Sequence, residues 1–249
     1  MTTPQPTELY TLDSRRELFQ RDAIFLSASV PYDKKFDSQQ DHARYQENLH
    51  YLATARPEAV REAVAHLCRG AFQRDINLIF GAHPAISPMV LDIAGRFAPT
   101  APIPEKRVII FQSAFFDATS IPRATLDLAR WDAGELILTA PQGSAGQPDR
   151  AMSLLHMREL MVRSPRLIAA VFIGGMEGVK EESALFARYN PGKPRYAIGS
   201  TGSAAADLLD ADEDHYSGRN PGPTMRNLLE TSPSYPLVIE RIFEDLGVP

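Results

Sequence analysis

The sequence predicts an α/β protein with a Rossmann-like three-layer sandwich, in which helices cover both faces of a mostly parallel sheet. Short apolar runs alternate with helical patterns along the chain, as in parallel sheets built by helical crossovers. Several of these runs end in small or glycine-rich turns that lead into a helix, which is where such folds bind ligands. The 249 residues fit one domain. We expect an N-terminal arm over 1–21, a core over 22–210 and a C-terminal helical extension over 211–249.

Six apolar runs are the expected strands. Each is short and continuous rather than alternating, which is typical of a parallel strand buried on both faces. They lie at residues 22–27, 77–80, 107–111, 135–138, 166–173 and 195–198.

Helices are expected between these strands. In Pro57–Phe72 the proline suits a first turn, and Val60, Val64, Leu67 and Ala71 form one apolar stripe. Further helices are expected near 122–131, 149–163 and 178–189, with two or three more after residue 201 and a helical insert over 32–55.

Composition and charge exclude several classes of protein. An apolar content of 44% with 23% charged residues indicates a soluble globule rather than a disordered chain. The net charge of −5 argues against nucleic acid as a partner. No apolar run reaches the ~20 residues that span a bilayer, and no secretory signal is visible, so no membrane is expected. A lone cysteine, Cys68, fits a reducing compartment, and we expect a cytoplasmic protein. The six histidines lack metal-ligand spacing, so no metal is expected. No cofactor is expected either.

Four segments at the expected carboxyl ends of strands are candidate ligand-binding turns: 27–29, 81–84, 174–178 and 199–203. Three contain glycine just before a helix, where backbone N–H groups can converge on an anion. Glycine also makes tight turns for structural reasons alone, and His83 is as consistent with turn packing as with ligand binding. A nucleotide or sugar phosphate is the expected ligand. The expected binding residues are Ser27, Ser29, Gly81, His83, Gly174, Gly175, Met176, Glu177, Gly178, Val179, Ser200, Thr201 and Gly202.

Two charged residues fall on expected core-facing stripes of consecutive helices. Arg158 lies in the middle of the apolar face of the 149–163 helix, and Glu182 lies on that of the next helix. These faces are expected to comprise Ala151, Leu154, Leu155, Met161 and Val162 in the first helix and Leu185, Phe186 and Tyr189 in the second, with Leu160 pointing away. A buried charge needs a partner, so the two side chains are expected to meet at the ligand edge of the sheet. The alternatives are a ligand site and a structural ion pair.

The same residues carry a resemblance to a known family. The helix His156-Met157-Arg158-Glu159-Leu160-Met161 and the turn Gly174-Gly175-Met176-Glu177-Gly178-Val179-Lys180-Glu181-Glu182 resemble the Lonely Guy proteins. Those proteins have an Arg-Lys pair in a helix, followed by Pro-Gly-Gly-x-Gly-Thr-x-x-Glu. The chain is more closely similar to the wider SLOG superfamily, which includes DprA-like proteins and ligand-sensing domains of bacterial conflict systems. Similarity to a branch of it extends to 24–31 and 80–84, and covers roughly residues 22–210.

The resemblance implies a function as well as a fold. Lonely Guy enzymes hydrolyse the N-glycosidic bond of nucleoside 5′-monophosphates, and their catalytic Arg and Glu correspond to Arg158 and Glu182. The sequence departs from their motif at four places: Ile173 replaces the proline, one residue is inserted at Met176-Glu177, Val179 replaces the threonine, and Glu159 replaces the lysine. These departures affect how a phosphate is held and which substrate is accepted.

Two functions are therefore carried forward. The first is an N-glycosidase acting on a nucleotide or NAD-like metabolite, with Arg158 and Glu182 as catalytic residues. The alternative is a non-catalytic sensor of a nucleotide-derived signal in antiphage signalling, acting through a partner or self-assembly, so that a homo-oligomer is expected. An NAD-dependent oxidoreductase is less well supported because GxGxxG is missing after the first strand.

Overall fold

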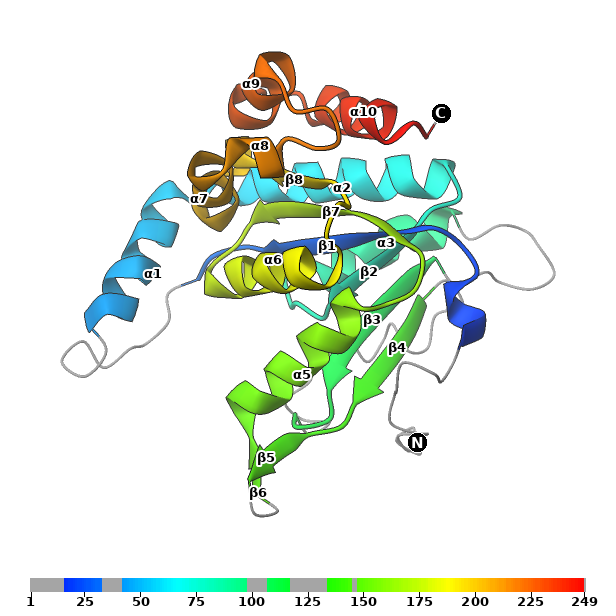
Figure 1. Ribbon diagram of the computed structural model, residues 1–249, viewed down its shortest axis with the longest axis vertical. Coiled ribbons are helices and arrows are strands. Elements are labelled where there is room, and N and C mark those ends of the chain that lie inside the picture. The colour runs from blue at the N-terminus through cyan, green and yellow to red at the C-terminus, as the bar shows by residue number, and fades with distance from the viewer. Residues whose placement is uncertain (1–15, 33–41, 98–106, 117–133, 145–146, 249) are drawn as a thin grey trace.

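The computed structural model describes residues 16–32, 42–97, 107–116, 134–144 and 147–248. Its centre is a six-stranded parallel sheet, shown in Figure 1, with the strand order β4-β3-β2-β1-β7-β8. The strands are β1 (Ala23–Ser29), β2 (Asn77–Gly81), β3 (Val108–Ser113), β4 (Gly134–Thr139), β7 (Leu167–Gly174) and β8 (Arg195–Ile198). All six predicted strands and the predicted Rossmann-like α/β class are confirmed.

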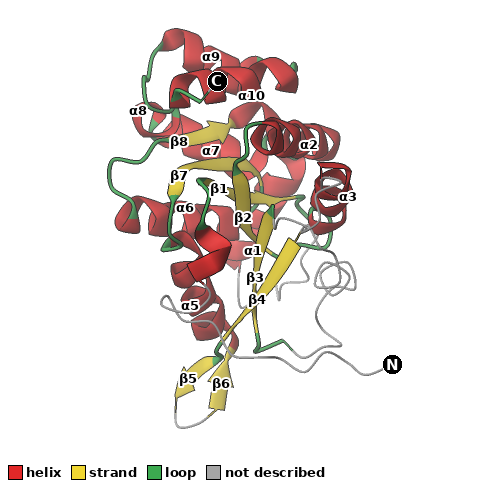
Figure 2. Ribbon diagram, turned by 90° about the vertical axis from the view of Figure 1, so that its right-hand side faces the viewer, coloured by secondary structure: helices red, strands yellow, loops and turns green. Residues whose placement is uncertain are grey.

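Helices cover both faces of this sheet, as Figure 2 shows edge-on. One face carries α2 (Pro57–Gln73) and α3 (Ser87–Phe97), and the other carries α5 (Arg150–Val162) and α6 (Glu177–Tyr189). The strand order reverses direction between β1 and β7, because the chain runs outward from β1 to β4 and then crosses back to β7. In doubly wound sheets ligands bind in the crevice at this switch point.

The remaining elements surround the carboxyl edge of the sheet and one flank. The first is α1 (His42–Thr54), which lies in the expected insert. After β8 come η2 (Gly199–Thr201), α7 (Ser203–Ala211), α8 (Glu213–Tyr216), α9 (Pro223–Thr231) and α10 (Tyr235–Leu246). Four helices therefore follow residue 201 where two or three were expected, and α8 is a single turn.

The C-terminal extension belongs to the same hydrophobic core as the sheet, because α10 packs on α2. On α10 the buried stripe Val238, Ile239, Ile242 and Phe243 faces α2, and Gly70 of α2 lets it approach closely. Cys68 is fully buried on the same side of the molecule. Burial raises the pKa of its thiol, which fits a packing role.

Three further differences from the sequence prediction concern local structure. The arm before residue 22 contains a described 3-10 turn, η1 (Arg16–Phe19), and Phe19 is buried in the core. An unpredicted antiparallel hairpin, β5 (Gln142–Ser144) and β6 (Gln147–Asp149), precedes α5. The helix predicted near 122–131 lies outside the described residues.

The predicted inner face of α5 is confirmed at Met161 and Val162, which are buried, and wrong nearer the start of the helix. Ala151 and Leu155 are exposed, whereas the supposedly outward Leu160 is only 6% exposed. The other buried residues of α5 are Ser153, Met157 and Leu160. The Ser153 hydroxyl turns inward because it bonds both backbone groups of Gln142: it accepts from the N–H at 2.9 Å and donates to the carbonyl at 3.1 Å. An apolar count cannot anticipate a buried serine with two backbone partners.

Candidate functional site

The candidate site lies at the switch point between β1 and β7, where the two strands end side by side. Ser27 pairs with Phe172, and Ser29 pairs with Gly174, the last residue of β7. Ser27 and Ser29 belong to β1 itself, so the predicted turn at 27–29 is the end of a strand. The side chain of Ser27 therefore has a fixed direction from the sheet rather than the freedom of a loop.

Ser27, Glu182 and Arg158 form a connected polar cluster, which we call the switch-point cluster. The Ser27 hydroxyl donates to Oε2 of Glu182 at 2.5 Å. The Arg158 Nε donates to the other carboxylate oxygen, Oε1, at 3.4 Å. Ser27 comes from β1, Arg158 from α5 and Glu182 from α6, so three elements converge here. The predicted contact between Arg158 and Glu182 is confirmed.

Arg158 makes a second ion pair, which the sequence analysis did not predict. Its Nη1 lies against Oε2 of Glu181, and the guanidinium also covers Gly178. A Cβ at residue 178 would lie 2.9 Å from Nη2 of Arg158, so glycine there makes the close approach possible. One guanidinium thus faces two carboxylates. The only signal in the sequence was that Glu181 and Glu182 are adjacent.

The cluster is largely removed from solvent, and this changes the acidity of its carboxylate. The side chain of Glu182 is 14% exposed and that of Arg158 is 18% exposed. Burial raises the pKa of Glu182 above its ordinary value, and the opposing effects of Arg158 and Ser27 do not cancel this rise. Glu182 is consequently a better proton acceptor than an exposed carboxylate. A perturbed carboxylate with a cationic partner at a ligand edge is typical of a functional site.

The glycine-rich turn before α6 uses several of its backbone donors internally. Gly174 N–H donates to the Thr201 hydroxyl at 2.8 Å, and Gly175 N–H donates to the Ser29 carbonyl at 2.9 Å. Val179 N–H donates to the Met176 carbonyl at 2.9 Å. In this conformation these three amides hold the turn together. Their predicted role in ligand binding stays a prediction.

The helix after this turn begins earlier than predicted. Met176 is the N-cap, and α6 starts at Glu177, so that Glu177, Gly178 and Val179 form its first turn. N–H groups in a first turn have no partner one turn earlier within the helix. Gly178 carries one of these N–H groups, and the guanidinium of Arg158 lies close to this glycine.

His83 lies in the loop after β2, whose last residue is the predicted site residue Gly81. Its ring Nδ1 accepts from the Ala85 backbone N–H at 3.2 Å, and the backbone N–H of His83 donates to the Ser87 hydroxyl at 3.1 Å. Burial lowers the pKa of His83 to about 4. The ring is therefore neutral at pH 7, with its proton on Nε2. These bonds order the turn, and ligand binding by Gly81 and His83 stays a prediction.

The turn at residues 199–203 is packed against α1 instead of opening toward the switch point. A Cβ at Gly202 would lie 2.0 Å from the Thr54 carbonyl oxygen. Ser203 N–H donates to the Thr54 hydroxyl at 3.3 Å, and the Ser203 hydroxyl donates to the Tyr51 carbonyl at 2.9 Å. Ser200 and Thr201 are also buried. Of these predicted residues, Thr201 is linked to the end of β7, because its hydroxyl accepts the hydrogen bond from Gly174 N–H.

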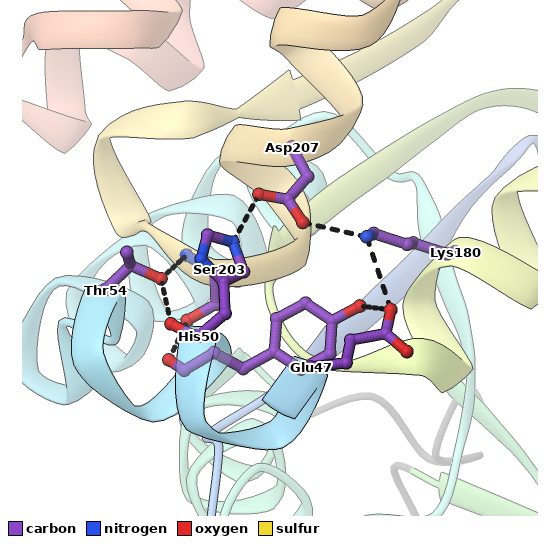
Figure 3. Close-up of polar contacts among 7 residues, drawn as sticks. Glu47, His50, Thr54, Lys180, Ser203 and Asp207 are labelled. Carbon is purple, nitrogen blue, oxygen red and sulfur yellow. Dashed lines mark hydrogen bonds and ion pairs between the residues drawn. The ribbon is translucent and has the colours of Figure 1, made fainter. Parts of the chain in front are cut away.

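A second polar network joins α1 to α6 and α7, as Figure 3 shows. Lys180 Nζ lies 2.8 Å from Asp207 and 3.5 Å from Glu47, and His50 Nε2 lies 2.8 Å from the other Asp207 oxygen. The Tyr51 hydroxyl donates to Glu47. Burial alone would lower the pKa of Lys180, but its interactions with Asp207 and Tyr51 outweigh this effect and raise it. The sequence carried no signal for this network because its partners come from three separate helices.

Within the part of the chain that the structure describes, no three His, Cys, Asp or Glu side chains lie together as a potential metal site. No described helix combines the length and the apolar character needed to cross a membrane.

The fold and the switch-point cluster together define a Rossmann-like α/β protein with a carboxylate–arginine site at the carboxyl edge of its sheet. Residues 50–219 match the model of the SLOG cluster3 family. The chain belongs to this family, and the matched segment contains both Arg158 and Glu182. No curated protein matches the sequence significantly.

Proposed function

We propose that the protein binds a nucleotide-derived small molecule at the switch-point cluster and hydrolyses its N-glycosidic bond. The observation that carries this proposal is the Glu182 carboxylate, which is buried, raised in pKa and bonded to Ser27 and Arg158. Membership of the SLOG family supports a nucleotide-derived ligand. The switch point is also where Rossmann-like sheets present their ligands.

In the proposed reaction, Glu182 acts on a water molecule at the anomeric carbon of the ribose. Glu182 accepts a proton as the water oxygen bonds to this carbon. The bond from carbon to the base nitrogen breaks, and its electron pair leaves with the base, which takes up a proton. A nearby carboxylate also stabilises the oxocarbenium-like charge of the transition state. The Ser27 hydroxyl holds the carboxylate in one orientation.

Arg158 is proposed to meet an anionic or electron-rich part of the ligand. It already contacts Glu181 and Glu182, so a bound phosphate would have to share or replace one of these carboxylates. The departures from the Lonely Guy motif agree with a ligand other than a simple nucleoside 5′-monophosphate. We therefore include dinucleotides and cyclic ADP-ribose among the candidate substrates.

A specific observation also supports the sensor as a second candidate. The Arg158 side chain connects α5 to two residues of α6. A ligand that drew Arg158 away from Glu181 and Glu182 would remove this connection and shift α5 relative to α6. A partner or a second copy of the chain would then bind the altered surface. The ligand favours the shifted state because it contacts Arg158 there in place of the two carboxylates.

The test incubates the protein with AMP, CMP, NAD and cyclic ADP-ribose, and follows base release by chromatography and melting temperature by calorimetry. Hydrolysis predicts free base from at least one ligand, and loss of this activity by at least tenfold in Glu182→Gln. Glu181→Gln is the matched control, because this neighbour contacts the same arginine but is 59% exposed. Intact ligand with a raised melting temperature would favour the sensor. Neither release nor a shift would contradict both candidates.

A further inference from the structure

A second candidate site lies at the carboxyl edge beyond β8, separate from the switch-point cluster. It is a hollow of about 210 Å³ lined by Arg56, Ala59, Glu62, Ser200, Thr231, Ser232, Pro233 and Tyr235. These residues come from the start of α2, from η2, and from the junction of α9 and α10. The volume is below the several hundred Å³ of a drug-sized ligand pocket and suits one small group.

Two long helices begin at this hollow and run in the same direction. Ala59 is in the first turn of α2, and Tyr235 is the first residue of α10. At the other end, Arg74, which directly follows α2, pairs with Glu240 of α10 at 2.7 Å, so the two helices run in parallel. Figure 1 shows them side by side. Both positive dipole ends therefore point toward the same hollow.

Among the described residues, no side chain is recorded as capping the start of either helix. The N-cap residues Arg56 and Ser234 make no side-chain capping bond. First-turn N–H groups without a cap need water or a ligand as a partner. An anion between the two helix ends would supply oxygen acceptors to both.

Arg56 adds a full positive charge at the rim of the hollow. Its side chain is exposed, and its Nη1 donates to the Ser200 carbonyl at 3.2 Å. Among the described residues it has no carboxylate within ion-pair distance. A guanidinium held by one neutral carbonyl retains further donors for a phosphate.

Ser200 supplies an independent indication that a ligand belongs here. It is 3% exposed and lines the hollow, and its Oγ has no hydrogen-bond partner in the described part of the chain. A buried unsatisfied hydroxyl costs free energy and therefore needs an explanation. An oxyanion reaching the floor of the hollow would accept this hydrogen bond.

We propose that this hollow binds one phosphate group of a small metabolite. Arg56 holds the phosphate at the rim, the Ser200 hydroxyl donates to it from the floor, and the first-turn amides of α2 and α10 contribute the remaining donors. Glu62 also lines the hollow, and its carboxylate weakens binding by repulsion. The site shares no lining residue with the switch-point cluster, so this proposal stands independently of the proposed function.

The experiment titrates the full chain with inorganic phosphate at constant ionic strength, with chloride as the reference anion, and follows backbone amide shifts by NMR. Saturable shifts are expected at Ala59, Ser200 and Tyr235. Arg56→Gln should weaken binding at least tenfold, and Ser200→Ala severalfold. Glu62→Gln should strengthen binding, and this gain cannot arise from misfolding. Arg61→Gln is the matched control, since it removes an exposed arginine of the same helix that already pairs with Glu58 at 2.6 Å.

A second titration identifies the form of the phosphate. Ribose 5-phosphate should bind at the same amides, whereas ribose should leave them unchanged. The proposal is overturned if no saturable shift occurs up to about 20 mM phosphate. It is equally overturned if Arg56→Gln and Arg61→Gln bind phosphate alike. Loss of base release in Glu182→Gln has no bearing on this result, so the two proposals fail separately.

Discussion

At the residue scale, we expect the substitution Glu182→Gln to have opposite effects on activity and on stability. Its folded pKa lies above the ordinary 4.5, so the folded state favours the neutral acid and loses stability as the pH rises above about 4.5 through the folded pKa. Glu182→Gln mimics the neutral acid at every pH. We expect the variant to melt at the wild-type temperature or higher at pH 7, and to match wild type near pH 4, while losing base release.

Calorimetry of both proteins between pH 4 and pH 8 checks this prediction. A variant that melts much earlier than wild type at pH 7, with turnover per folded molecule unchanged, would identify Glu182 and Arg158 as a structural ion pair. Removing one member of a buried pair costs roughly 3–5 kcal/mol, so the two outcomes are far apart.

His83 gives a second prediction at the residue scale. Its contribution to stability changes with pH in the direction opposite to that of Glu182. Burial lowers its folded pKa to about 4, below the ordinary 6.5, so the unfolded chain binds a proton more readily. The stability contributed by neutral His83 is complete above pH 6.5 and is lost as the pH falls toward 4. NMR should show a neutral Nε2–H ring at pH 6. Between pH 6.5 and pH 4, His83→Gln should lose less stability than wild type. A His83 ring that titrates near pH 6.5 in the folded protein would contradict the prediction.

At the element scale, the turn between η2 and α7 determines how closely α1 can dock. Gly202 has φ +76°, and a Cβ there would lie 2.0 Å from the Thr54 carbonyl oxygen at the end of α1. Gly202→Ala therefore combines a strained backbone with a backbone collision. We expect a loss of roughly 3 kcal/mol or more in the free energy of unfolding.

Gly192→Ala is the matched control for this prediction. Its φ is +83°, yet a Cβ there would meet nothing within 4 Å, so only the backbone strain remains, at about 1 kcal/mol. Urea denaturation of both variants measures the difference. Equal losses would show that α1 does not press on Gly202. Hydrogen exchange in α1 should accelerate in Gly202→Ala alone.

At the scale of the whole molecule, ligand binding should stabilise the folded chain by mass action. A ligand at 100 times its Kd adds about 2.7 kcal/mol. For a chain of 249 residues this corresponds to a rise of about 5–10 °C in melting temperature. We expect this rise with at least one of the four candidate nucleotides. Arg158→Ala should reduce the rise more for phosphorylated ligands than for the matching nucleosides. Equal losses for both would argue against contact between Arg158 and negative charge.

The expected homo-oligomer is also a prediction about the whole molecule. A sensor that acts through self-assembly requires a mass above 27.6 kDa in solution, at least with ligand bound. Light scattering on a size-exclusion column, with and without the stabilising nucleotide, measures this directly. A monomer under both conditions would leave the sensor dependent on a separate partner protein.

Much of the fold followed from the sequence, because continuous apolar runs and amphipathic helices are local patterns that need no knowledge of their neighbours. The six strands, the helix over 57–73 and the contact between Arg158 and Glu182 were predictable for this reason. The motif residues on two consecutive helices also led to the correct family, because a motif is defined by residue types at given spacings along the chain.

Only the tertiary structure decided which side chains and backbone amides already have hydrogen-bond or ion-pair partners. The inner face of α5 depends on a serine bonded to a distant backbone, which hydrophobicity cannot indicate. The second carboxylate on Arg158 and the internal bonds of Gly174 and Gly175 depend on distances between separate elements. The network of Lys180 and the hollow at Arg56 are assembled from three or more elements. A hydrogen-bond partner is a property of position in space, and the sequence alone does not contain it.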